Sequence, residues 1–136
     1  MRCIFKLLFA LFLAFTLNAD EYALISNKDI THLSTNQIKA IYLKKLTMIN
    51  GQVIIPINLD ARDQLRQKFS QNLLHMSFER LKSYWTQEHY LGHRPPLSLK
   101  SQESVKKFIK NVDGSIGYIN MKNIDKNITI LYRWED

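Results

Sequence analysis

Two arginines, Arg62 and Arg66, stand about one helical turn apart in a stretch that could bind an anion. The stretch from Pro56 to Phe69 reads PINLDARDQLRQKF, and it turns through Asn58 and Asp60 from a β-rich segment into an amphipathic helix. On a helical wheel Leu65, Phe69 and Leu73 form one apolar stripe. Both arginines fall on that stripe, at its N-terminal end. Because the free N–H groups and positive dipole end of a helix attract anions, inward-facing arginines there predict an oxyanion pocket.

The same stretch also fits a structural role. Asp60 and Asp63 are placed to satisfy the free N–H groups at the helix start. The two arginines would then extend from the edge of the core into solvent. The residues alone therefore leave two interpretations open, an anion site or an ordinary helix start with solvated arginines.

Other side chains with reactive chemistry do not form the pattern of a catalytic or metal site. His89 and His93 are four residues apart, but Gly92 lies between them near a helix end, and no carboxylate or cysteine completes a ligand set. The acidic residues are dispersed, and the sequence contains neither a Ser-His-Asp nor a Walker A pattern. We therefore predict that the protein is not an enzyme and has no metal and no cofactor.

Tyr84, Trp85 and Tyr90 form an aromatic cluster at helical spacing. Such a cluster can stack against a ligand or a partner. Core packing is the more frequent role of aromatic residues at this spacing, and we expect it here.

Asn127-Ile128-Thr129 is an N-glycosylation sequon. Asp125, two residues before it, matches the extended acidic form known from some bacteria. Such triplets also arise by chance, so the sequence does not decide whether Asn127 carries a glycan.

The first residues are typical of a secretory signal peptide. A basic start and an apolar run from Leu7 to Leu17 precede Asn18-Ala19 and an acidic pair, which predicts cleavage near Ala19 and export to the periplasm. The apolar run is too short to span a membrane comfortably. The single cysteine, Cys3, precedes that run, so the mature chain is expected to have no disulfide and to depend on its core.

The remaining residues, 20–136, have the length and apolar content of a single domain. Removal of Arg2 and Lys6 with the signal peptide leaves 17 basic against 12 acidic residues. A basic surface suits anionic ligands, lipid head groups or polyanions. The lysines are scattered and are not interleaved with stacking aromatic residues, so nucleic-acid binding is not predicted.

Hydrophobic periodicity and capping signals predict an α/β domain. Strands are expected at 22–25, 53–55, 116–119 and 128–132, and helices are expected to begin at Ser34, in the arginine stretch, at Ser77 and at Ser101. Ser34 and Gln37 form a capping box, and Asn50-Gly51 is a turn signal. Because helices link successive strands, at least part of the sheet is expected to be parallel.

Six segments, taken in order, resemble the periplasmic phosphate-binding proteins of ABC importers, specifically their short single-domain relatives. The segments are LSTNQIKAIYL at 33–43, the passage at 44–58, LRQKF at 65–69, LKSYW at 81–85, GHRPP at 92–96 and DGSIGYI at 113–119. The resemblance implies a single lobe of a type 2 periplasmic-binding-protein-like fold, with a small mixed sheet flanked by about four helices. It also implies phosphate or another small oxyanion as ligand, and an ABC permease as partner.

The resemblance gives the predicted ligand residues different degrees of support. Arg66 matches an arginine of the family's ligand site. Ser26 and Asn27 stand where the family's hinge strand ends. Arg62 is supported by the helical wheel alone, and Asn58 lies at the turn before the helix.

Departures from the family leave a second function open. Full-length members have two lobes, whereas this chain has about the length of one. The family's Ser-Gly-Ser-Gly-Thr type phosphate loop is replaced by DARDQL at 60–65, which lacks the small residues whose N–H groups wrap a phosphate. A lobe without that loop would serve as a structural or adaptor protein of the cell envelope, with an envelope protein or a second copy of the chain as its partner.

Overall fold

The computed structural model describes residues 20–136 apart from 29 and 31, so the predicted signal peptide at 1–19 lies outside the described residues. The main strands are β1 (Glu21–Ser26), β4 (Ile55–Leu59), β5 (Leu97–Leu99), β6 (Ser115–Asn120) and β7 (Thr129–Glu135). They form one sheet in the order β5-β4-β6-β1-β7. β4 is parallel to β5 and β6, whereas β1 is antiparallel to β6 and β7, so the sheet is mixed as the sequence predicts.

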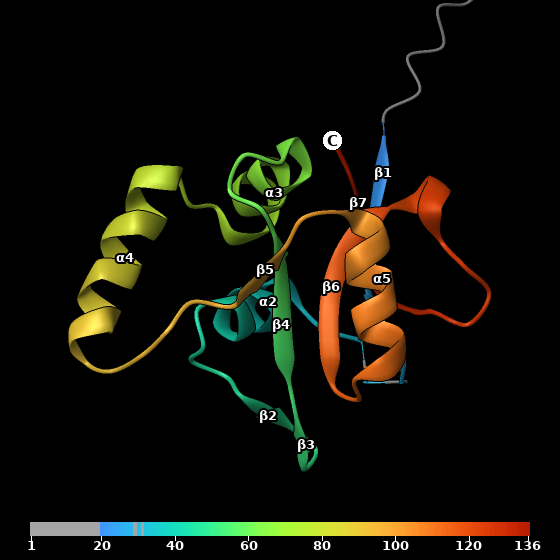
Figure 1. Ribbon diagram of the computed structural model, residues 1–136, viewed down its shortest axis with the longest axis horizontal. Coiled ribbons are helices and arrows are strands. Elements are labelled where there is room, and N and C mark those ends of the chain that lie inside the picture. Colours follow the sequence, from blue (N-terminus) through green and yellow to red (C-terminus); the bar gives the residue numbers. More distant parts are fainter. Residues whose placement is uncertain (1–19, 29, 31) are drawn as a thin grey trace, which may run out of the picture.

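Four α-helices connect and cover these strands in the described part of the chain. They are α2 (Thr35–Tyr42), α3 (Gln64–Phe69), α4 (Phe78–Tyr90) and α5 (Gln102–Asn111). A π-helical turn, η1 (Ser70–Leu74), continues α3, and a 3-10 turn, η2 (Met121–Asn123), follows β6. Figure 1 shows α5 in front of the sheet, α2 behind β4, and α4 standing apart from the rest. None of these helices is long and apolar enough to cross a membrane.

The two faces of the sheet are distinguished by neighbouring residues of β6. A Cβ built on Gly117 would meet Val105 and Ile109, so Gly117 faces α5. The next residue, Tyr118, stacks on Phe69 of α3 with ring centroids 4.0 Å apart and lies 6.1 Å from the ring of Tyr42 in α2. Because successive residues of a strand point to opposite faces, α5 covers one face and α2 with α3 cover the other.

Local sequence signals correctly predict the first helix and the first turn. The Ser34 hydroxyl accepts a hydrogen bond from the N–H of Gln37, and the Gln37 side chain accepts one from the N–H of Ser34, which completes the capping box. Asn50 and Gly51 both have positive φ, 50° and 80°. They connect a hairpin of β2 (Met48–Ile49) and β3 (Gln52–Val53), as expected for Asn-Gly. Residues 53–55 were predicted to form one strand, and the separate β2–β3 hairpin was not predicted.

Helix α4 contradicts the expectation that its aromatic residues lie in the core. None of its residues, all of which the structure describes, is buried. Tyr84 and Trp85 are half-buried, whereas Tyr90 is 84% exposed. The predicted helix is present, but Tyr90 lies about 120° around its axis from Tyr84, on a side that the rest of the domain does not cover. The other helices and the sheet make only a few contacts with Tyr84 and Trp85. One of them is a 2.7 Å hydrogen bond from the Tyr84 hydroxyl to the carbonyl oxygen of Leu43.

Gly114, at the turn from α5 into β6, is required for two reasons. Gly114 has φ of +81°, and a Cβ there would overlap the carbonyl oxygen of Val53. We expect Gly114→Ala to destabilise the protein more than Gly92→Ala, because Gly92 has φ of +82° but open space around it. Both changes carry the left-handed backbone penalty of about 1–2 kcal/mol, and only the first adds the overlap. Urea unfolding measures the difference, and equal losses would contradict the packing at Gly114.

Candidate functional site

The carboxyl ends of the parallel strands β4, β5 and β6 lie at one edge of the sheet, where α3 and α5 begin. In open α/β sheets this edge is where ligands bind. The carboxylate of Asp63 accepts a 2.8 Å hydrogen bond from the N–H of Leu65, and the hydroxyl of Ser101 accepts one from the N–H of Ser104. Both helix starts are therefore capped by side chains of the chain itself.

Arg66 is the predicted ligand residue that the structure places best for binding. It is half-buried, and its Nη1 donates to the carbonyl oxygen of Leu59 at 2.9 Å and to the hydroxyl of Ser98 at 3.2 Å. These bonds join the carboxyl ends of β4 and β5. Within the described residues, all side-chain hydrogen bonds of Arg66 start from Nη1, so Nε and Nη2 are left for a ligand.

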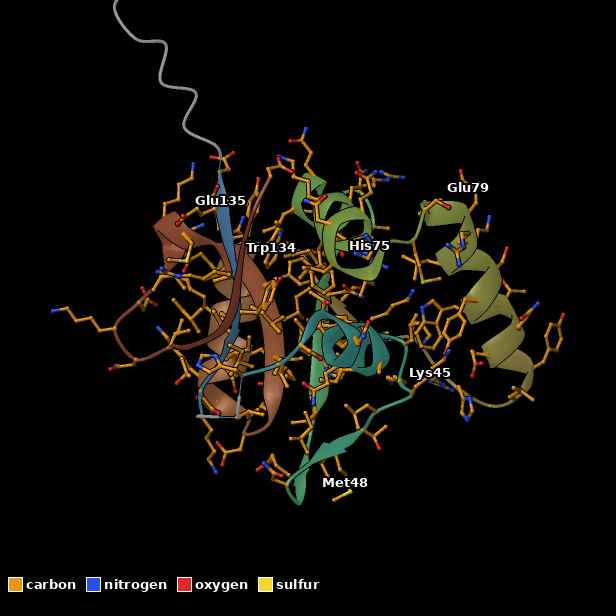
Figure 2. All side chains as sticks on the ribbon, turned by 180° about the vertical axis from the view of Figure 1, so that it is seen from behind. Lys45, Met48, His75, Glu79, Trp134 and Glu135 are labelled. Carbon is orange, nitrogen blue, oxygen red and sulfur yellow. The ribbon has the colours of Figure 1, made fainter. Side chains whose placement is uncertain are left out.

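Arg66 lies on the wall of a cavity of about 530 Å³ between α3–η1 and α4, here called the α3–α4 cavity. Its polar lining includes Gln67, Ser70, Gln71 and Ser77, and its apolar lining consists of Ala61, Met76, Phe78, Leu81, Trp85 and Pro95. A volume of this size is typical of small-molecule sites. Figure 2 shows Glu79, another lining residue, at one end of α4, and Lys45 reaching the same helix from the body. The ammonium group of Lys45 lies 5.7 Å from the ring centroid of Tyr84.

A second hollow at this edge, of about 230 Å³, is less suited to an anion. It is lined by the acidic residues Asp20 and Asp63, and Lys68 is the cation among its lining residues. The ammonium group of Lys68 is paired with Asp136 at 2.5 Å and donates to the hydroxyl of Tyr22 at 3.0 Å. Its positive charge is therefore already matched, and the α3–α4 cavity is the better candidate.

Arg62 does not lie on the helix, so its predicted place on the apolar stripe is wrong. The chain turns at 61–62, with the N–H of Asp63 bonded to the carbonyl oxygen of Asp60 at 2.9 Å. The helix begins only at Gln64, with Asp63 as its N-cap, and Arg62 is exposed. The helical wheel assumed that helical geometry started earlier than it does.

The side chain of Asn58 is hydrogen-bonded within the protein. Its Oδ1 accepts a 2.8 Å hydrogen bond from the hydroxyl of Tyr118, and that hydroxyl accepts one from the N–H of Leu59 at 3.2 Å. Burial raises the pKa of Tyr118 above its usual range, although the nearby charge of Arg66 acts in the opposite direction. The neutral phenol therefore stays a donor to Asn58.

Ser26 and Asn27 lie at the opposite end of the sheet from Arg66. Ser26 is the last residue of β1 and Asn27 follows it. β1 is antiparallel to β6, and Ile25 pairs with Gly117. Ser26 is fully buried, and Asn27 donates to the carboxylate of Asp113 at 2.9 Å. The structure thus separates these two residues from the site around Arg66.

Ser98 and the residues other than Arg66 that line the α3–α4 cavity were not predicted as site residues from the sequence. Ser98 belongs to β5, a three-residue strand that follows Pro95-Pro96 and was not among the predicted strands. That extended, proline-bounded segment was the one available signal for an edge strand. The cavity depends on where α4 stands, which no local pattern in the sequence specifies.

The histidines do not assemble a metal site in the described part of the chain. His93 Nδ1 lies 2.5 Å from a carboxylate oxygen of Glu88, and His89 is exposed. No group of three or more histidine, cysteine, aspartate or glutamate residues is arranged to hold a metal ion among these residues.

Solved structures that share the fold include two phosphate transport proteins. An ABC-type phosphate transport receptor from Vibrio cholerae matches with a TM-score of 0.67 and 20% sequence identity, over 86% of this chain and 47% of the receptor. A putative phosphate ABC transporter substrate-binding protein with bound phosphate, from Clostridium perfringens, matches with a TM-score of 0.66 and 21% identity, over 82% and 44% of the two chains. The chain thus spans less than half the length of either protein. No family model matches the sequence, and neither does any curated protein.

These matches confirm the predicted fold, a mixed α/β lobe like that of phosphate-binding proteins. At these identities the likeness concerns the fold. The ligand residues stay predictions, and they are weighed on the geometry of the site.

Removing the hydroxyl of Tyr118 should destabilise the lobe. We expect Tyr118→Phe to lower the free energy of unfolding by about 1–3 kcal/mol, because the buried N–H of Leu59 loses its side-chain partner and Asn58 loses a donor. Tyr132→Phe is the matched control, since the half-buried Tyr132 hydroxyl makes no hydrogen bond within the described residues. Urea unfolding of both variants measures the effect. Equal stabilities would show that the Tyr118 hydroxyl is not a structural anchor.

Proposed function

We propose that the chain is an exported, non-catalytic binding protein whose ligand is phosphate or another small oxyanion. The observation that carries the proposal is the half-buried guanidinium of Arg66, which lies on the wall of a ligand-sized cavity beside the carboxyl ends of β4 and β5. The likeness of the fold to two phosphate transport proteins supports it. The signal-peptide pattern at 1–19 supports export to the periplasm.

Arg66 is fixed in position before any ligand arrives. Its bonds to Leu59 and Ser98 hold one end of the planar guanidinium, so little rotational freedom is lost when an anion binds at the other nitrogens. Ser70 and Gln67 on the same wall supply neutral hydrogen-bonding groups. Such a site binds and orients an anion, and it needs no nucleophile or base. An ABC permease is the partner that this function implies.

Anion binding should appear as thermal stabilisation that depends on Arg66. A ligand at 100 times its Kd that binds only the folded state adds about 2.7 kcal/mol of stability, which raises Tm by several degrees. We expect millimolar phosphate to raise the Tm of the wild-type chain, and chloride at equal ionic strength to have no such effect. Arg66→Gln should abolish the shift.

Arg62→Gln is the matched control, because it removes an equal charge from an exposed turn outside the cavity. Its shift with phosphate should equal that of the wild type. A wild type that does not respond to phosphate or sulfate, or an Arg62→Gln variant that loses the response as fully as Arg66→Gln, would contradict the proposed site.

A second candidate function is supported by the surface of α4. Phe78 is 63% exposed, and Tyr90 and Leu91 at the other end of the helix are 84% and 69% exposed. Apolar side chains gathered on an exposed element mark contact surfaces. This surface favours a structural or adaptor protein of the cell envelope that docks α4 on an envelope protein or on a second copy of the chain.

The adaptor function predicts an association that depends on the C-terminal end of α4. The full chain purified from its envelope should form a complex of fixed composition, either with one envelope protein or as a dimer. Tyr90→Lys with Leu91→Lys should yield a free monomer in analytical ultracentrifugation, since charges there oppose apolar contact. Met48→Lys with Val53→Lys, which alters exposed apolar residues of the β2–β3 hairpin, should leave the complex intact. A wild-type chain found only as a monomer would contradict this function.

A further inference from the structure

We propose that the α3–α4 cavity binds an amphipathic organic anion, with its anionic head on Arg66 and its apolar body against α4. The inference rests on the proposed function, because it specifies the class of ligand for the same site. It assigns roles to Phe78, Leu81 and Trp85 that oxyanion binding does not use.

The size and lining of the cavity exceed what an inorganic oxyanion needs. Its volume of about 530 Å³ is in the range of sites for whole organic molecules. Phe78, Leu81 and Trp85 form the α4 wall, and Met76 and Pro95 lie on the segments before and after that helix. A phosphate ion bound to Arg66 would leave these apolar side chains in contact with water.

The apolar wall lacks cover within the described lobe. No residue of α4 is buried, and Phe78 is 63% exposed although it lines the cavity. Covering apolar surface is favourable because it removes that surface from water. An occupant with an apolar body would therefore gain binding free energy that a bare oxyanion does not.

The charge of the cavity excludes a purely apolar occupant. Arg66 and Lys82 are the cations among the described lining residues, and Glu79 is the acid, so one positive charge is unmatched. Arg66 is already half-buried, and an apolar molecule placed over it would remove its remaining water without supplying a partner. A ligand that brings its own negative group avoids this penalty.

The position of α4 is fixed well enough for its wall to act as one side of a site. The Tyr84 hydroxyl donates to the carbonyl oxygen of Leu43, and the ammonium group of Lys45 lies over the Tyr84 ring. Trp85 packs edge-on against Tyr84, with ring centroids 4.9 Å apart. The contact that ties α4 to the body therefore also orients the indole on the cavity wall.

Three probes of graded chemistry test the proposal on the full chain. They are octyl phosphate below its micellar concentration, octanol and inorganic phosphate, followed by calorimetry and by the emission of Trp85. We expect octyl phosphate to bind at least ten-fold more tightly than either other probe. The emission change should vanish in Trp85→Phe, because the other tryptophan, Trp134, packs beside Tyr22 and Phe69 away from the cavity.

Variants separate the two halves of the ligand. Arg66→Gln should weaken octyl phosphate about ten-fold and leave octanol unchanged, whereas Phe78→Ser should weaken octyl phosphate and leave inorganic phosphate unchanged. Arg66→Gln also removes the hydrogen bonds to Leu59 and Ser98, so it could lower affinity by loosening the contact between β4 and β5. Lys82→Gln avoids this, because the exposed Lys82 side chain lines the cavity from α4, and it should lower the affinity for octyl phosphate about two-fold. Arg80→Gln is the control, since Arg80 is on the same helix but does not line this cavity.

Each contrary outcome is distinct. Equal affinities for inorganic and octyl phosphate would overturn this inference and leave the oxyanion function standing. Octanol binding as tightly as octyl phosphate, with no effect of Arg66→Gln, would overturn both. Trp85 emission that changes with protein concentration in the absence of ligand would show that a second copy fills the cavity, and would also overturn the inference. If octyl phosphate binds as expected, cosedimentation of the chain with phosphatidylglycerol vesicles would identify a membrane lipid as the ligand. A chain that binds octyl phosphate but does not cosediment with the vesicles would have a free amphiphile as its ligand.

Discussion

The stack of Phe69 on Tyr118 is the contact on which the geometry of this lobe depends. It joins α3 to β6 with ring centroids 4.0 Å apart, and Tyr42 of α2 packs edge-on against Phe69 at 4.6 Å. Arg66 precedes Phe69 by three residues on the same helix, so the stack that seats Phe69 also fixes where the arginine stands. The hydroxyl of Tyr118 extends the same contact to Asn58 and Leu59 at the end of β4. Aromatic packing in the core thus determines where the Arg66 guanidinium lies at the carboxyl ends of β4 and β5.

Signals carried by a few neighbouring residues predicted much of the fold. The capping box of α2, the Asn-Gly turn and the buried stripe of Leu65, Phe69 and Leu73 depend on contacts within one or two turns of chain, and all are present. Segment order and the resemblance together predicted the mixed lobe. The three residues of β5 carry too little pattern to identify a strand, because their pairing with β4 decides it. The exposure of α4 depends in the same way on what the body offers to it, and the spacing of its aromatic residues does not contain that information.

The candidate site was only partly predictable because its residues are brought together by strand direction. In the sequence, Ser26-Asn27 at the end of β1 and Asn58 near the end of β4 look equivalent. Because β1 is antiparallel to β6 and β4 is parallel to it, the carboxyl ends of β1 and β4 lie at opposite ends of the sheet. Arg62 fails for a local reason, since the turn at 61–62 delays the helix until Gln64. Arg66 alone of the five predicted residues lines the α3–α4 cavity, and it is also the one supported by both the helical stripe and the resemblance.

The same turn explains why the start of α3 is a poor place for an anion while Arg66 is a good one. Asp63 puts its own carboxylate on the N–H of Leu65, so the chain already supplies the negative group that a phosphate would bring to the helix start. A second anion there would meet like charge from Asp63 and Asp60. The Arg66 guanidinium lies away from the helix start, with Nη1 bonded to Leu59 and Ser98. It lines the α3–α4 cavity together with apolar side chains of α4. The proposed anion site therefore relies on one arginine with an apolar neighbour, and not on the backbone N–H groups of a glycine-rich loop. We therefore expect the proposed site to favour an organic anion over an inorganic one.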